Sequence, residues 1–145
     1  MTLNLSRFEK ILEMLNILEN NTKFVSHLHI PLQAGSDHIL KAMNRRYTRD
    51  EFIDMVKIIK EKRPGISLST DIIVGFPGET DEDFNDTLDL CRIVGFSKIH
   101  VFPYSDRNGT VASKMKDKVD GNIKKQRVLR RRSTEGAEKV FIQRL

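Results

Sequence analysis

The fold of this chain is decided by one stretch, Ser69-Thr70-Asp71-Ile72-Ile73-Val74-Gly75-Phe76-Pro77-Gly78-Glu79-Thr80. Side chains alternate along a strand, so Ile72 and Val74 share an aliphatic face, while Asp71 shares the other face with small or uncharged groups. The two glycines bracket a turn, and Thr80 with the acids after it predicts a helix N-terminus. This order of strand, turn and capped helix predicts an α/β protein with a ligand site beside Asp71.

Hydrophobic periodicity predicts further elements on either side of this stretch. Two more strands are expected over 25–33 and 98–102. Helices are expected over 6–19, from a cap at Ser36 to about 44, from Thr48 to about 62, over 81–94, and over 122–145.

The strands lie 30 to 40 residues apart and each precedes a helix, which predicts parallel βα units. A sheet covered on both faces would have two aliphatic faces on each strand. Here one face of each strand is polar or aromatic, which favours a barrel with a polar lumen. The predicted fold class is therefore α/β, a partial TIM-type (βα) barrel of about three units, because three are too few for closure.

Composition restricts the class of protein. The chain has 145 residues, 39% hydrophobic and 31% charged, as expected for one globular domain. No apolar run reaches the roughly 18 residues of a membrane span. The single cysteine, Cys91, excludes an internal disulfide framework, so a cytoplasmic location is expected. Its spacing from Leu88 and Phe84 predicts burial in a helix rather than a nucleophile.

A basic run lies near the C-terminus, inside the last predicted helix. We interpret it as a nucleic-acid contact, with a solvated helix face as the alternative. Its residues are Lys124, Lys125, Arg127, Arg130, Arg131 and Arg132.

The polar strand faces carry histidines that raise the question of a metal site. His27 and His29 share a face, and Asp71 or His100 could supply a third ligand. Histidines hydrogen-bonded inside a polar barrel are the favoured alternative, so no metal ligand is predicted.

Several segments together resemble the radical S-adenosylmethionine (SAM) methylthiotransferases. The match covers about residues 25 to 132 and is closest to the bacterial branch that modifies threonylcarbamoyladenosine in tRNA. Ala34 stands where serine is usual, and Asp106 and Asn108 replace usual prolines. The segments are His29-Ile30-Pro31-Leu32-Gln33-Ala34-Gly35-Ser36, Met43-Asn44-Arg45-Arg46-Tyr47-Thr48, Thr70 to Thr80, His100-Val101-Phe102-Pro103-Tyr104-Ser105 and Arg107-Asn108-Gly109-Thr110.

The resemblance implies roles for matching residues only. Asp71 would accept hydrogen bonds from the SAM ribose, and Gln33 would touch the same ribose. Arg45 would pair with the methionyl carboxylate, for which a bidentate guanidinium is suited. Ile73, Gly75 and Phe102 would lie beside the adenine.

The resemblance also implies what this chain does not contain. The family's [4Fe-4S] cluster that cleaves SAM is held by three cysteines spaced Cys-x-x-x-Cys-x-x-Cys. Residues 1–145 are therefore interpreted as the second half of a radical SAM core, without the N-terminal cluster domain, the cluster loop or the C-terminal tRNA-binding domain. By itself this part is expected to be inactive and to bind neither SAM nor a cluster.

The parent enzyme would add a methylthio group to the 2-position of threonylcarbamoyladenosine in tRNA. One alternative is a relative acting on isopentenyladenosine tRNA or a ribosomal protein, and another is a non-catalytic α/β RNA-binding module. We also expect self-association, because the strands at 25–33 and 98–102 would leave unpaired edges and the last helix could exchange between chains.

Overall fold

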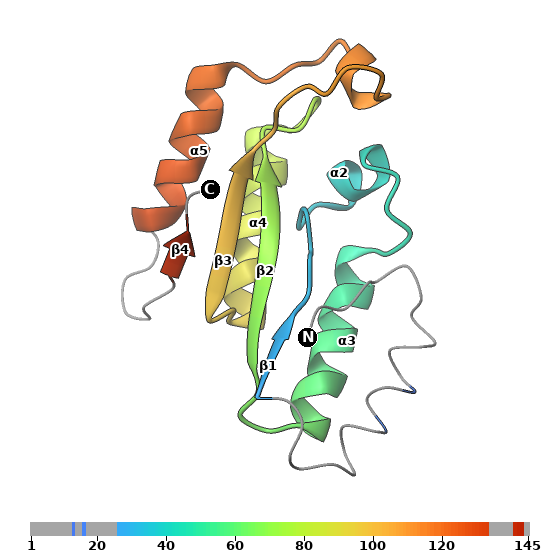
Figure 1. Cartoon of the computed structure of the whole chain (residues 1–145), viewed down its shortest axis with the longest axis vertical. Coiled ribbons are helices and arrows are strands. Elements are labelled where there is room, and N and C mark those ends of the chain that lie inside the picture. The colour runs from blue at the N-terminus through green and yellow to red at the C-terminus, as the bar shows by residue number, and fades with distance from the viewer. Residues whose placement is uncertain (1–12, 14–15, 17–25, 134–140, 144–145) are drawn as a thin grey trace.

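The structure, a computed structural model, describes residues 13, 16, 26–133 and 141–143. Its backbone forms a four-stranded parallel sheet in the order β1-β2-β3-β4 (Figure 1). The strands are β1 (His27–His29), β2 (Ser67–Val74), β3 (Lys98–Pro103) and β4 (Phe141–Gln143). The helices are α2 (Asp37–Ala42), α3 (Arg49–Lys62), α4 (Asp81–Val94) and α5 (Gly121–Ser133), with a short 3-10 helix, η1 (Ala112–Lys114). No described helix is both long and apolar enough to span a bilayer.

The first strand is shorter than expected. Regular pairing of β1 with β2 stops at His29, and beyond it only an isolated bridge joins Gln33 to Ile72. Pro31 lies in the gap and has no N–H to donate to a ladder, which accounts for the interruption.

The expectation of one helix over 122–145 is wrong at its C-terminal end. Helix α5 ends at Ser133, and Phe141–Gln143 forms β4 instead. The β-branched and aromatic run Val140-Phe141-Ile142 favours a strand over a helix. Because β4 pairs with β3, the exposed edge expected on β3 is covered. The helix expected over 6–19 lies outside the described residues, apart from residues 13 and 16.

The aliphatic strand faces form the core as predicted. Leu28, Ile30 and Leu32 are fully buried, and Ile72 is 1% exposed. Helix α4 lies behind β2 and β3 and packs against α3, so these helices cover that face of the sheet (Figure 1). The predicted inward residues of α3 and α4 are all buried: Phe52, Met55, Val56, Ile59, Phe84, Leu88 and Cys91.

Helix caps position the segments that follow the strands. Thr80 and Asp83 form a complete capping box at the start of α4, and Gly95 ends this helix at a φ of 70°. Thr48 accepts from the Glu51 N–H at the start of α3. Ser36 makes no side-chain cap, contrary to expectation, because its hydroxyl donates to Asp83 of α4.

The outer edge of β1 has no strand beside it among the described residues. The Ile30 N–H donates to Ser69 of β2, so by alternation the His27 N–H points away from β2. We expect the chain to self-associate in sedimentation experiments at micromolar concentration, and His27→Pro to weaken this association by removing an outward donor. A sharply melting monomer at the same concentration would contradict the expectation.

Candidate functional site

A cavity of about 470 Å³ opens at the carboxyl ends of the strands. Five of the six residues predicted to bind a cofactor line it. The complete lining is Gln33, Arg45, Asp71, Ile73, Phe102, Pro103, Tyr104, Ser105, Arg107 and Thr110. The size falls in the range of roughly 300–1,000 Å³ typical of small-molecule sites.

Gln33 reaches the cavity through an unusual backbone conformation. Its φ is 72°, a region that residues other than glycine seldom adopt. Its N–H donates to the Asp71 carbonyl and its carbonyl accepts from Ile73, each at 2.8 Å. The buried Tyr47 hydroxyl donates to the preceding carbonyl, that of Leu32, at 2.8 Å, and burial raises the pKa of Tyr47 to about 12. Backbone strain held by surrounding bonds is typical of ligand sites.

Arg45 enters the lining from the end of α2. Asn44 adopts a φ of 58°, and the Arg45 N–H closes the turn on the Leu40 carbonyl at 2.9 Å. Asparagine tolerates this left-handed conformation better than most residues. Asn44 therefore explains the turn that brings Arg45 to the cavity.

Asp71 lies opposite His100 in the pairing of β2 with β3. Its Oδ2 is 3.0 Å from His29 Nε2, and His29 Nδ1 is 2.7 Å from the Ser69 hydroxyl. The Asp71 side chain is 29% exposed. It can accept further hydrogen bonds from a ligand, since one carboxylate has about four lone-pair positions.

Two of the three histidines on the polar strand faces, His27 and His29, make side-chain hydrogen bonds. His27 contacts Ser67 and lies 2.9 Å from the Ser69 hydroxyl, so it does not join the group around Asp71. Ligand atoms of His29, Asp71 and His100 lie within 4.8 Å of one another. His29 is hydrogen-bonded to both Ser69 and Asp71, whereas His100 Nδ1 is buried without a hydrogen-bond partner among the described residues.

Gly75 is the predicted site residue that does not line the cavity. Its φ is 75°, and a Cβ there would lie 2.3 Å from Lys124 Cγ of α5. The Gly75 N–H donates to Glu79 Oε1 at 2.8 Å. Glycine therefore fits the turn and leaves room for Lys124, and its contact with a cofactor stays a prediction.

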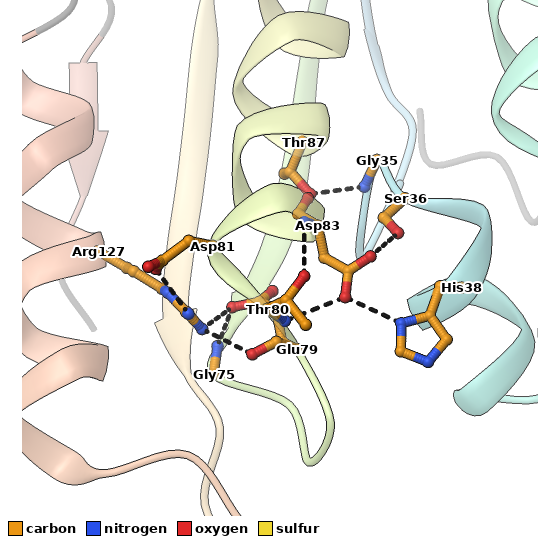
Figure 2. A network of polar contacts seen from close by, with 10 residues as sticks. All are labelled: Gly35, Ser36, His38, Gly75, Glu79, Thr80, Asp81, Asp83, Thr87 and Arg127. Atoms are coloured by element: carbon orange, nitrogen blue, oxygen red, sulfur yellow. Dashed lines mark hydrogen bonds and ion pairs between the residues drawn. The ribbon is translucent and has the colours of Figure 1, made fainter.

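Figure 2 shows how Arg127 of α5 joins the turn after β2 to the start of α4. Arg127 Nη1 donates to Glu79 Oε1 at 2.6 Å, and Nη2 lies 3.1 Å from Asp81 Oδ1. The side chains of Arg127 and Glu79 are 6% and 1% exposed. Burial raises the pKa of Glu79, whereas the Gly75 N–H and Arg127 act in the opposite direction.

A second network in Figure 2 joins α2 to α4 through Asp83. Asp83 accepts from the Ser36 hydroxyl at 2.6 Å and the Thr80 N–H at 3.0 Å, and lies 2.9 Å from His38 Nδ1. Nearby, the Gly35 N–H donates to the Thr87 hydroxyl at 2.9 Å. These bonds hold the Gln33 segment against α4.

The basic run on α5 is divided between two environments. Arg127 is buried, and Lys124 donates to the Tyr104 carbonyl at 3.0 Å, so both contact this chain. Lys125 is exposed. The side chains of Arg130, Arg131 and Arg132 lie outside the described residues. The proposed RNA contact therefore rests on Lys125 and these three arginines rather than on all six residues.

An iron–sulfur cluster does not fit the cysteine of this chain. Cys91 belongs to α4, is 6% exposed and is part of the apolar core. A cluster of the expected type needs several thiolates at one place, and the sequence has one cysteine.

Sequence reasoning missed the role of the loop after β3 in this site. Tyr104, Ser105, Arg107 and Thr110 line the cavity, yet no binding role was predicted for them. They fall within the Tyr-Ser and Arg-Asn-Gly-Thr segments of the family resemblance, which was the available signal.

Comparison with known proteins agrees with the resemblance. The model of the radical SAM superfamily matches residues 1–91. The chain is 48% identical over 118 residues to threonylcarbamoyladenosine tRNA methylthiotransferase MtaB of Bacillus subtilis, covering 81% of this chain and 26% of that protein. It is 50% identical over 117 residues to tRNA-2-methylthio-N(6)-dimethylallyladenosine synthase of Pelotomaculum thermopropionicum, with the same coverage of both chains. The chain thus spans about a quarter of the length of these relatives.

Solved structures support the partial barrel. Methylornithine synthase (PylB) aligns with 94% of this chain and 46% of its own, with a TM-score of 0.62 and 14% identity. Streptococcus suis SuiB bound to S-adenosylmethionine aligns with 90% of this chain and 29% of its own, with a TM-score of 0.58 and 16% identity. At these identities the likeness concerns the fold alone, and it confirms the predicted partial α/β barrel.

Proposed function

The chain belongs to the radical SAM superfamily, and from this premise we propose that it forms the second half of the catalytic barrel of a tRNA methylthiotransferase. The parent protein would add a methylthio group to the 2-position of threonylcarbamoyladenosine in tRNA. Support comes from relatives at 48% and 50% identity that carry methylthio-transfer names. These relatives are named for two different adenosines, so the choice of threonylcarbamoyladenosine rests on the sequence segments described above.

The observation that carries the proposal is the convergence of Gln33, Arg45 and Asp71 on one cavity. The donor set suits SAM: a carboxylate for ribose hydroxyls, a guanidinium for the methionyl carboxylate, and the apolar Ile73 and Phe102 for the adenine. Bound SAM supplies the methyl group and, at a cluster, the radical. The residues of this chain would bind and orient SAM, while the cysteines for a cluster would come from another part of the protein.

Without the cluster, which would chelate the methionyl amine and carboxylate, this chain alone is expected to bind SAM weakly or not at all and to be inactive. We also propose that residues 1–145 form an internal part of the parent protein, and that the parent is located in the cytoplasm. A cluster-reconstituted parent supplied with SAM, a one-electron reductant and a sulfide source should add a methylthio group to a stem-loop RNA containing threonylcarbamoyladenosine, as read by mass spectrometry. An active preparation that leaves this RNA unchanged would exclude this substrate.

Asp71→Ala in the reconstituted parent is expected to reduce SAM affinity by roughly 10- to 100-fold, because a carboxylate hydrogen bond to a ligand contributes roughly 1.5–3 kcal/mol. Calorimetric titration with SAM measures the loss, and iron content checks that the clusters are intact. Asp54→Ala, at an exposed position on α3, is the matched control. Equal SAM affinity in the two variants would remove Asp71 from the site.

The second candidate, a non-catalytic RNA-binding module, draws on the exposed basic residues of α5. Such a module would bind RNA with strong salt dependence but would show no SAM binding even in the reconstituted parent. The titration of the unsubstituted parent with SAM therefore separates the two functions.

A further inference from the structure

The cavity has a second wall that the proposed SAM contacts do not use. This wall is the loop after β3, which contributes Tyr104, Ser105, Arg107 and Thr110 to the lining. The SAM contacts proposed above come from Arg45 and from the strand ends on the other side. The loop wall is thus free to bind a different ligand group.

The charges of the lining are unbalanced. Two guanidinium groups, Arg45 and Arg107, face a cavity with one carboxylate, Asp71. Neither arginine forms an ion pair within the described part of the chain, whereas Arg49 and Arg127 each contact a carboxylate. SAM has one carboxylate, which Arg45 would bind. Arg107 therefore remains for a second anionic group.

The loop itself keeps Arg107 unpaired. Its neighbour Asp106 accepts from the Tyr104 hydroxyl at 2.9 Å and from Lys118, whose ammonium also lowers the pKa of Asp106. The acid adjacent in sequence is thus engaged elsewhere. The backbone of Arg107 is held as well, because its carbonyl accepts from the Thr110 hydroxyl at 2.8 Å and the Thr110 N–H at 3.2 Å. A fixed backbone and an unpaired guanidinium are what an anion-binding position requires.

We infer that Arg107, with the adjacent Ser105 hydroxyl, forms a second anion subsite that binds the RNA substrate inside the cavity. This inference rests on the proposed function and extends it to a named contact. The anionic oxygens have two sources on such an RNA: the threonine carboxylate of a threonylcarbamoyl group, or a phosphate beside the modified nucleotide. Both match the bidentate guanidinium.

The test compares Arg107→Gln with Arg46→Gln in the reconstituted parent. Arg46 is exposed and absent from the cavity lining, so its variant controls for the loss of one positive charge. Arg107→Gln is expected to lower affinity for a threonylcarbamoyladenosine stem-loop about tenfold, because a charge-assisted pair is lost. Its SAM affinity should match that of the unsubstituted protein.

Binding to a second stem-loop, which carries unmodified adenosine, distinguishes the threonine carboxylate from a phosphate as the anion bound by Arg107. A loss confined to the threonylcarbamoyl RNA assigns the carboxylate, whereas an equal loss on both RNAs, with a salt slope smaller by about 1, assigns a phosphate. The inference is overturned if Arg107→Gln behaves like Arg46→Gln on both RNAs, or if it reduces SAM affinity instead. Failure of the unsubstituted parent to modify RNA would count against the proposed function. This activity measurement is independent of the affinities that compare Arg107→Gln with Arg46→Gln.

Discussion

Replacing Arg127 with methionine is expected to destabilise the folded chain by about 3–5 kcal/mol, the range for removing one partner of a buried ion pair. The Glu79 carboxylate, whose side chain is 1% exposed, accepts hydrogen bonds from the Gly75 N–H and from Arg127. Of these two donors, the substitution leaves the Gly75 N–H. Methionine keeps most of the side-chain volume over the Phe84 ring, so packing loss is minor. Urea unfolding followed by circular dichroism measures the change.

The pH dependence of this loss identifies its cause. Without Arg127, the folded-state pKa of Glu79 should lie further above its ordinary value of 4.5. A carboxyl whose folded pKa is raised binds more protons in the folded state, so stability should fall as the pH rises above about 4.5. The Arg127→Met variant should thus approach the unsubstituted chain at low pH and differ most at neutral pH.

A double variant separates the buried charge from lost packing. Adding Glu79→Gln to Arg127→Met removes the uncompensated carboxylate and should restore a large part of the stability. If the double variant is less stable than Arg127→Met alone, the buried charge is not what destabilises the single variant. Arg92→Met, at an exposed position on α4, controls for the loss of a surface cation.

The parts of the fold that sequence reasoning predicted well are those with local signals. Helix α4 has the predicted bounds, Asp81–Val94, because Thr80 caps its start and Gly95 ends it. The alternation of Ile72 and Val74 with Asp71 correctly divides β2 into a core face and a polar face. Period-2 alternation and caps are encoded within a few residues, so one sequence suffices to detect them.

The errors concern features set by contacts far apart in sequence. Serine is a common N-cap residue, but the Ser36 hydroxyl donates instead to Asp83, which is 47 residues away in the sequence. Arg127 stands in a basic run that resembles a solvated RNA-binding face, yet it pairs with Glu79 across 48 residues. Phe141–Gln143 has local strand propensity, but its partner is the edge of β3 about 40 residues earlier, and this pairing was not predicted.

The cavity was predictable only on one side. Gln33 follows β1, Arg45 follows the short helix α2 and Asp71 lies in β2, and the topology brings all three to one edge. Arg107 and Thr110 lie in an irregular loop, where no periodicity specifies which side chains turn inward. The family resemblance placed that loop near the site but assigned it no ligand.

Asp83 should make the stability of the chain depend on pH in the acid range. Burial by itself would raise the pKa of this carboxyl, but hydrogen bonds from Ser36, the Thr80 N–H and His38 outweigh it and lower the pKa to about 2. Because the folded pKa lies below the ordinary value of 3.8, the stabilisation is complete above about pH 4 and is lost as the pH falls toward 2. The shift corresponds to about 2 kcal/mol.

Asp83→Asn is therefore expected to lower the free energy of unfolding by about 2 kcal/mol at pH 7 and to flatten its decline between pH 4 and pH 2. Asparagine has nearly the same shape, so the difference reports the charge and its donors rather than packing. Glu82→Gln removes an equal charge from the same first turn of α4 at an exposed position, and should change stability by less than about 0.5 kcal/mol. Parallel pH profiles for Asp83→Asn and the unsubstituted chain would show that the three donors do not stabilise the Asp83 carboxylate, and that the contact between α2 and α4 depends on packing alone.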